Sequence, residues 1–133
     1  MIRGAGETVL LVEDDEMLRC TTARVLAKFG YRVLAATDGV EALQAFEGNR
    51  EEIRLVVSDV VMPRLDGPGL LRAIRKAGSG VSFIFTSGRS EDQLAAELDE
   101  RPFRFLAKPW NVQSLARAVR EALEAATPEV QPA

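Results

Sequence analysis

The chain has 133 residues, of which 47% are hydrophobic, and this is enough apolar material for one domain with a proper core. Its net charge of −3, from 17 basic and 20 acidic residues, provides no general positive field and so argues against a nucleic-acid partner. No apolar run approaches the ~20 residues of a membrane span, so we expect no direct membrane insertion. The absence of histidine excludes mechanisms that need an imidazole on this chain.

Apolar runs of strand length alternate with helical patterns along the chain. Several runs are nearly continuous in apolar character, which is typical of strands buried on both faces of a sheet. The predicted strands span residues 8–12, 31–36, 53–58, 81–86 and 103–107. A helical pattern follows each of them, and this alternation predicts a three-layer α/β sandwich around a parallel sheet.

Residues that commonly cap helices mark where the helical patterns begin. The predicted caps are Asp38, Asp66, Asn111, and Ser90 with Gln93 in a capping-box pattern. The first helix follows the acids at 13–16 and is expected to end at Gly30. Its amphipathic pattern predicts that Cys20, the only cysteine, is a small buried hydrophobe, and a lone cysteine without a disulfide suits a reducing cytoplasm.

Polar side chains stand at the ends of four predicted strands. They are Glu13 and Asp14, Asp59, Thr86, and Lys108. Ligands of open α/β sheets bind beyond the carboxyl ends of the strands, and all of these side chains would project from that edge. Three crowded carboxylates repel one another, and a hard divalent cation with oxygen ligands would compensate them. The cluster therefore predicts a Mg²⁺ pocket prepared for a phosphoryl group.

Four motifs in register resemble the receiver domain of two-component response regulators. They are "ED" at 13–14, "SDVVMPRLDG" at 58–67, "TSG" at 86–88 and "KPW" at 108–110. The resemblance covers residues 7–126, which we expect to form the domain between short flexible ends at 1–6 and 127–133. It implies a flavodoxin-like (βα)5 sandwich with strand order 2-1-3-4-5, an order that alternation alone does not determine.

The resemblance implies a role for each of these residues. Asp59 would be the phosphoacceptor, which attacks a phosphohistidine and becomes an aspartyl phosphate. Glu13, Asp14, Asp59 and the backbone carbonyl of Val61 would form the Mg²⁺ site, with Asp14 as a direct ligand and Glu13 acting through water. Asp15 matches no ligand position and is expected to favour the start of the first helix, as is the acid that follows it.

Lys108 would contact a phosphoryl oxygen and pair with Asp59 beforehand, and its bond to Pro109 resembles the cis peptide of the family. Thr86 and Phe105 would form the switch, with a hydroxyl on the phosphoryl group and an aromatic ring that moves inward behind it. Trp110 is expected to pack as a hydrophobic anchor. Each residue alone has an ordinary structural explanation, and the four motifs in register favour the functional one.

The resemblance also implies partners. The phosphodonor would be a histidine kinase or a histidine phosphotransfer protein. A downstream protein or linked domain would read the face made by the fourth helix, fifth strand and fifth helix. The domain would catalyse its own phosphorylation and dephosphorylation without being a turnover enzyme. Only seven residues follow Ala126, so we expect no output domain in cis. A cytoplasmic location is expected, either alone or as the receiver of a membrane-anchored hybrid sensor kinase.

Two other function classes remain open at this point. An Asp-nucleophile, Mg²⁺-dependent phosphatase uses the same types of site residue. That class, however, is typified by a D-x-D motif at the first strand, where this chain has Glu-Asp-Asp at 13–15. A degenerate receiver that acts only as a binding module would be expected to lack one of the key residues. None of them is missing.

Overall fold

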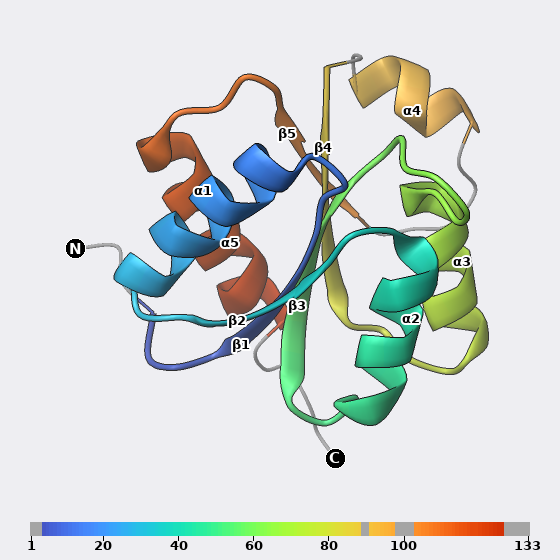
Figure 1. Cartoon of the computed structure of the whole chain (residues 1–133), viewed down its shortest axis with the longest axis horizontal. Helices are drawn as coiled ribbons and strands as arrows, with labels where there is room; N and C mark the ends of the chain where they lie inside the picture. The colour runs from blue at the N-terminus through green and yellow to red at the C-terminus, as the bar shows by residue number, and fades with distance from the viewer. Residues whose placement is uncertain (1–3, 89–90, 98–102, 127–133) are drawn as a thin grey trace.

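Strands and helices alternate strictly through residues 4–88, 91–97 and 103–126, which a computed structural model describes (Figure 1). The strands are β1 (Thr8–Val12), β2 (Arg32–Ala36), β3 (Ile53–Asp59), β4 (Ser82–Ser87) and β5 (Arg104–Ala107). The helices are α1 (Glu16–Lys28), α2 (Gly39–Gly48), α3 (Gly67–Lys76), α4 (Glu91–Glu97) and α5 (Val112–Ala126). Each predicted strand is therefore present, with its ends shifted by no more than one residue.

The strands form one parallel sheet in the order β2-β1-β3-β4-β5, which confirms the predicted fold class and strand order. Helices α1 and α5 cover one face, and α2 and α3 cover the other (Figure 1). This arrangement brings the carboxyl ends of β1, β3, β4 and β5 to the same edge of the sheet. Within the described residues, no helix is both long and apolar enough to cross a bilayer.

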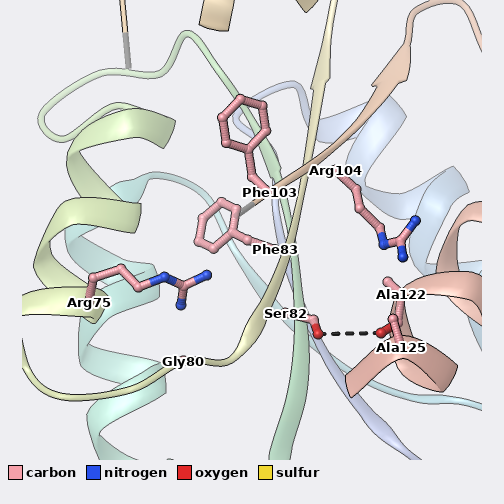
Figure 2. Close-up of a pocket in the computed structure, with 8 residues that line it drawn as sticks. All are labelled: Arg75, Gly80, Ser82, Phe83, Phe103, Arg104, Ala122 and Ala125. Atoms are coloured by element: carbon pink, nitrogen blue, oxygen red, sulfur yellow. Dashed lines mark hydrogen bonds between the residues drawn. The ribbon is translucent and has the colours of Figure 1, made fainter. Parts of the chain in front are cut away.

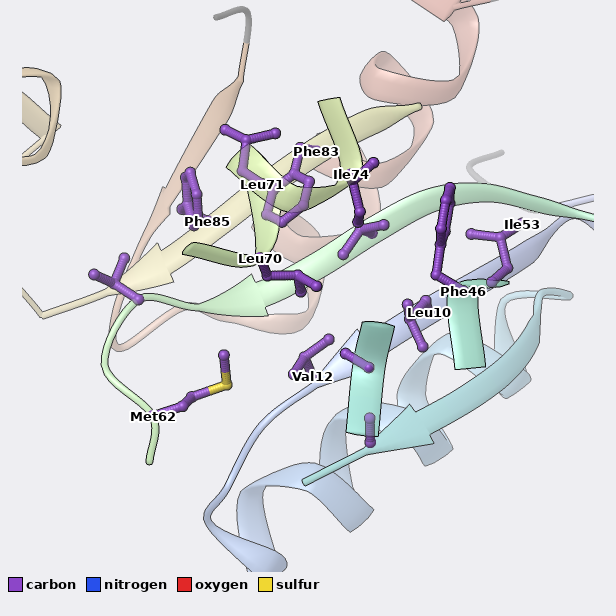
Figure 3. Close-up of a cluster of buried hydrophobic side chains, with 14 of the residues drawn as sticks. Leu10, Val12, Phe46, Ile53, Met62, Leu70, Leu71, Ile74, Phe83 and Phe85 are labelled. Atoms are coloured by element: carbon purple, nitrogen blue, oxygen red, sulfur yellow. The ribbon is translucent and has the colours of Figure 1, made fainter. Parts of the chain in front are cut away.

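Two hydrophobic clusters fill the space between the sheet and its two helical layers. Alternate side chains of β1 divide between them: Leu10 and Val12 join the α3-side cluster, while Val9 and Leu11 join the α5-side cluster. The α3-side cluster also contains Phe46, Leu70, Leu71, Ile74, Phe83 and Phe85 (Figure 3). The α5-side cluster includes Leu26, Leu115 and Val119. Burial on both faces explains why the strand sequences are continuously apolar.

The predicted helix caps have the expected hydrogen bonds wherever the structure describes them. The caps Asp38 and Asp66 accept from Glu41 N and Gly69 N at 2.8 Å, and Asn111 and Ser114 cap each other at 2.8 and 3.0 Å. Ser90 lies outside the described residues. Asp15 also caps α1, because its carboxylate accepts from Leu18 N at 2.9 Å. Helix α1 stops at Lys28, and Gly30 follows with a φ of 95°.

The prediction that Cys20 is buried is wrong, because its side chain is exposed on α1. The buried face of this helix carries Thr22 and Leu26 instead, four residues apart. Thr22 can occupy that face because its hydroxyl donates to the carbonyl of Leu18 at 2.7 Å, which satisfies the polar group within the helix. The buried face of α1 therefore includes a threonine, and a prediction based on apolar residues alone placed that face at the wrong positions.

Gly39, the first residue of α2, is expected to tolerate no larger residue. A Cβ at this position would lie 2.1 Å from the carbonyl oxygen of Leu65, so the backbone of one segment must shift. We expect Gly39→Ala to lower the free energy of unfolding by about 2 kcal/mol in urea denaturation. Gly48→Ala is the matched control at the other end of α2, where a Cβ meets nothing within 4 Å. A stability of Gly39→Ala equal to that of Gly48→Ala would contradict the close approach.

Candidate functional site

Three acidic side chains meet at the carboxyl edge of the sheet. Glu13 follows β1 directly and is only 4% exposed, whereas Asp14 beside it is exposed. Asp59 is the last residue of β3 and is half-buried. Carboxylate oxygens of all three residues lie within 4.8 Å of one another. The structure thus brings together the acids that the sequence placed on two separate strand ends.

Lys108 is the cation of this cluster. Its ammonium lies 3.2 Å from Glu13 Oε1 and 3.3 Å from Asp59 Oδ2, and its backbone N–H donates to the carbonyl of Ser87 at 2.9 Å. The loop after β5 is therefore fixed to the end of β4, and the ammonium is aimed at the acids. The peptide bond from Lys108 to Pro109 is cis, as the resemblance implied.

The surroundings shift the pKa values of two groups in this cluster. Burial raises the pKa of Glu13, and the Asp15 N–H and the Lys108 ammonium offset only part of this rise. Burial alone would lower the pKa of Lys108, but its attraction to Asp59 and Glu13 is stronger and raises that pKa. Lys108 therefore stays charged at neutral pH and can pair with both acids.

The cluster suits a hard divalent cation. Three carboxylates face a single ammonium, so negative charge remains uncompensated, and all the donor atoms are oxygens. Asp14 is exposed, so water can complete a coordination shell. The carbonyl of Val61 accepts no hydrogen bond from the described residues and is free to serve as a ligand. These features fit Mg²⁺, which is held by few carboxylates and keeps several waters.

Thr86 and Phe105 lie on neighbouring strands close to this cluster. Thr86 is only 5% exposed and is the register partner of Asp59, and its carbonyl accepts from Val60 N at 3.2 Å. Phe105 is half-buried, pairs in register with Phe85 and packs against the α3-side cluster. The structure therefore places Thr86 beside Asp59 and Phe105 on the next strand.

Two cavities differ in their relation to the acids. One of about 510 Å³ is lined by Leu18, Thr21, Lys108, Pro109 and Trp110, and so opens beside the acidic cluster. Trp110 packs against the α5-side cluster there, as an anchor should. The other cavity, also of about 510 Å³, lies at the amino ends of β4 and β5, where Phe83 and Arg104 contribute to its wall (Figure 2). It contains none of the predicted site residues.

Sequence reasoning missed two arginines that contact the loops around the site. Arg19 of α1 donates from its guanidinium to the carbonyl of Glu13 at 3.0 Å. Arg64 forms an ion pair with Asp38, with 2.8 Å between Nε and Oδ2. Neither contact has a signal in the sequence, because one acceptor is a backbone atom and the other lies 26 residues away.

The fold and the cluster together define a class of protein. A parallel sheet of this strand order carries three acids and one lysine at its carboxyl edge, with a hydroxyl from the neighbouring strand end. This combination is suited to accepting a phosphoryl group on an aspartate, because the ammonium and a bound cation can compensate the charge of the phosphoryl oxygens and the hydroxyl can donate a hydrogen bond to them.

The sequence model of one protein family, the response regulator receiver domain, matches residues 9–120, and the chain belongs to this family. Sensor kinase CckA from Brucella abortus (strain 2308) is 48% identical over 118 residues, which make up 88% of this chain and 12% of CckA. Response regulator MprA from Mycobacterium sp. (strain KMS) is 36% identical over 125 residues, 93% of this chain and 54% of MprA. The chain thus spans well under two thirds of either relative.

A solved structure supports the same conclusion. The receiver domain of the hybrid histidine kinase CckA has a TM-score of 0.75 and 39% identity, over 87% of this chain and 98% of that domain. The chain is therefore a receiver domain of two-component signalling, as the motifs predicted. Its family consists of signalling domains and not of classical turnover enzymes, which argues against the phosphatase alternative.

Proposed function

We propose that this receiver accepts a phosphoryl group on Asp59 from a phosphohistidine, in a reaction that depends on Mg²⁺. The observation that carries the proposal is the position of the Asp59 carboxylate, 3.3 Å from the Lys108 ammonium and within 4.8 Å of the Glu13 and Asp14 oxygens. Glu13, Asp14, Asp59 and the carbonyl of Val61 would hold the metal. When bound, Mg²⁺ would supply positive charge to the phosphoryl oxygens.

In this reaction, a carboxylate oxygen of Asp59 attacks the phosphorus and forms a P–O bond. The P–N bond to the donor imidazole breaks, and the imidazole nitrogen keeps the electron pair and takes up a proton from water. Lys108, already held against Asp59, would then contact a phosphoryl oxygen, and the hydroxyl of Thr86 would donate a hydrogen bond to another. The chain's own residues thus orient the acceptor and neutralise the developing charge.

The donor would be a histidine kinase or a histidine phosphotransfer protein, a proposal supported by the similarity to a receiver of a hybrid histidine kinase. The switch would consist of Thr86, drawn toward the phosphoryl group, and Phe105, which moves into the space behind it. Phe105 is half-buried against the α3-side cluster, so an inward movement can bury it further. A downstream protein or linked domain would then bind the face formed by α4, β5 and α5.

Phosphorylation by a small donor tests this proposal. With Mg²⁺ and acetyl phosphate, the intact mass of the wild type should rise by one phosphoryl group, and Asp59→Asn should show no gain. Asp66→Asn is the matched control, because Asp66 caps α3 and asparagine caps helices equally well. The control should be labelled like the wild type. Labelling of Asp59→Asn to the wild-type level would contradict the assignment.

The lifetime of the phosphoryl group is expected to depend on Val61. In receivers, side chains two positions after the phosphoacceptor and two after the switch threonine flank the path of the attacking water. Here they are Val61, which is 68% exposed, and Gly88, and neither can hydrogen-bond that water. We expect Val61→Asn to shorten the lifetime several-fold, because it adds a polar group and keeps the backbone carbonyl.

This lifetime is measured as the decay of the phosphorylated mass after the donor is removed. Val112→Asn is the matched control, since Val112 is also an exposed valine, at the start of α5. An equal or longer lifetime in Val61→Asn would show that access of water, and not its orientation, limits hydrolysis.

A further inference from the structure

The loop between β3 and α3 has an unusual shape. Val60 and Met62 are buried, at 3% and 7% exposure, and the exposed Val61 is held between them. Met62 points into the α3-side cluster (Figure 3). Two residues later, Arg64 has a φ of 69°, a left-handed conformation that residues other than glycine rarely adopt. Contacts elsewhere in the fold must hold Arg64 in this conformation.

One such contact is an ion pair with the start of α2. Arg64 donates from Nε to Asp38 Oδ2 at 2.8 Å and from a terminal nitrogen to Asp38 Oδ1 at 3.3 Å. Asp38 is only 7% exposed and caps α2 with the same carboxylate. The hydrogen bond from Arg64 lowers the pKa of Asp38, so the carboxylate stays ionised at neutral pH.

A second contact lies next to the first. The N–H of Gly39 donates to the carbonyl of Leu65 at 3.0 Å, and the two segments approach so closely that Gly39 has no room for a Cβ. Arg64 is therefore fixed to the cap of α2, and Leu65 is fixed to the first residue of that helix. The carbonyl of Val61 lies only three residues before Arg64, with the buried Met62 between them.

We propose that the Asp38–Arg64 ion pair positions the carbonyl of Val61 for Mg²⁺, and that Arg64 is a positioning residue for the metal site. This inference rests on the proposed function. Mg²⁺ demands near-ideal octahedral geometry, so a small displacement of one ligand weakens its binding. Loss of the ion pair frees the loop at Arg64, and the Val61 carbonyl then no longer has one fixed place.

Two substitutions remove the ion pair without adding backbone strain and without removing the cap of α2. Arg64→Asn places a residue that tolerates the left-handed conformation, and Asp38→Asn keeps a side chain that caps α2. We expect calorimetry to show about tenfold weaker Mg²⁺ binding for each variant, as for other outer partners of metal ligands. The double variant should bind no more weakly than either single variant, because the two substitutions remove the same interaction.

Charge alone predicts a different pattern. Removing the positive charge of Arg64 should by itself strengthen the binding of a cation, whereas removing the negative charge of Asp38 should weaken it. Weaker binding in both variants therefore identifies the pairing as the cause. Arg72→Asn is the control, because it removes an exposed arginine of α3 that has no ion pair in the described part of the chain. It should bind Mg²⁺ like the wild type.

Two further measurements separate positioning from a general loss of stability. The Mg²⁺ concentration that half-saturates labelling by acetyl phosphate should rise about tenfold in Arg64→Asn, while the rate at saturating Mg²⁺ should stay at the wild-type value. In the metal-free protein, the Gly39 amide should exchange its hydrogen faster in this variant. If Arg64→Asn binds Mg²⁺ as tightly as the wild type, the positioning role of Arg64 is wrong, but the proposed function is unaffected. A wild type that binds no Mg²⁺ would overturn the proposed function as well.

Discussion

Replacing Asp14 with asparagine should weaken Mg²⁺ binding by about 100-fold or more, a larger loss than outer partners of metal ligands cause. Asp14 is the exposed acid of the cluster, and its carboxylate lies within 4.8 Å of the Glu13 and Asp59 oxygens. It is therefore the acid that can meet a hydrated cation at the least desolvation cost. Isothermal calorimetry measures the affinity directly.

The matched control for this experiment is Asp15→Asn. It removes one negative charge from the next residue, and asparagine can still cap α1. This variant should bind Mg²⁺ nearly as tightly as the wild type. If both variants lose affinity equally, the general negative charge of the loop attracts the ion and Asp14 is not a specific ligand.

Trp110 offers an optical signal for the same titration. It is the only tryptophan, and it lines the cavity beside the acids together with Lys108. Mg²⁺ should draw the Glu13 and Asp59 carboxylates away from Lys108 and so change the Trp110 emission. Flat emission in the wild type, with binding confirmed by calorimetry, would show that Trp110 is not coupled to the site.

Replacing Lys108 with alanine should change metal binding and phosphorylation in opposite directions. The ammonium lies about equally close to Glu13 and Asp59, so its removal leaves more negative charge for a cation. Mg²⁺ should bind about tenfold more tightly, whereas labelling by acetyl phosphate should slow by about 100-fold because no ammonium meets the phosphoryl oxygen. Calorimetry and the rate of mass gain measure the two effects on one protein sample.

Lys76→Ala, at the exposed end of α3, is the control for Lys108→Ala and should change neither quantity. Because Mg²⁺ binding should rise while labelling falls, the result cannot be explained by misfolding of the variant. A misfolded Lys108→Ala would lose both Mg²⁺ binding and labelling. Unchanged labelling at saturating Mg²⁺ would mean that Lys108 balances the acids and has no part in phosphoryl transfer.

Much of the fold was predictable because its strands are buried on both faces. Such strands read as continuous apolar runs, and β1 was predicted with its observed ends, Thr8 and Val12. The caps Asp38 and Asp66 located two helix starts, since a capping carboxylate acts on an N–H only three residues away. The strand order could not be predicted in this way, because alternation of strands and helices fits several orders. Only the resemblance to receivers selected one of them.

The composition of the acidic cluster was also predictable, because parallel topology places the strand ends together whatever the loops do. The supporting contacts were not. Cys20 was misplaced because a hydrogen-bonded threonine took the inner face of α1. The Asp38–Arg64 ion pair was invisible because it depends on a left-handed turn in one loop and the start of a helix 26 residues earlier. Such contacts arise from tertiary packing and not from local pattern.

Trapping the acyl phosphate identifies the residue that carries the phosphoryl group, which we propose to be Asp59. Borohydride reduces an aspartyl phosphate to homoserine, and trypsin then releases residues 55–64, a fragment in which Asp59 is the only carboxylate side chain. After labelling of the wild type with acetyl phosphate and Mg²⁺, we expect homoserine in this fragment and at no other acid. Homoserine at Asp14 or elsewhere, with residues 55–64 unchanged, would contradict it.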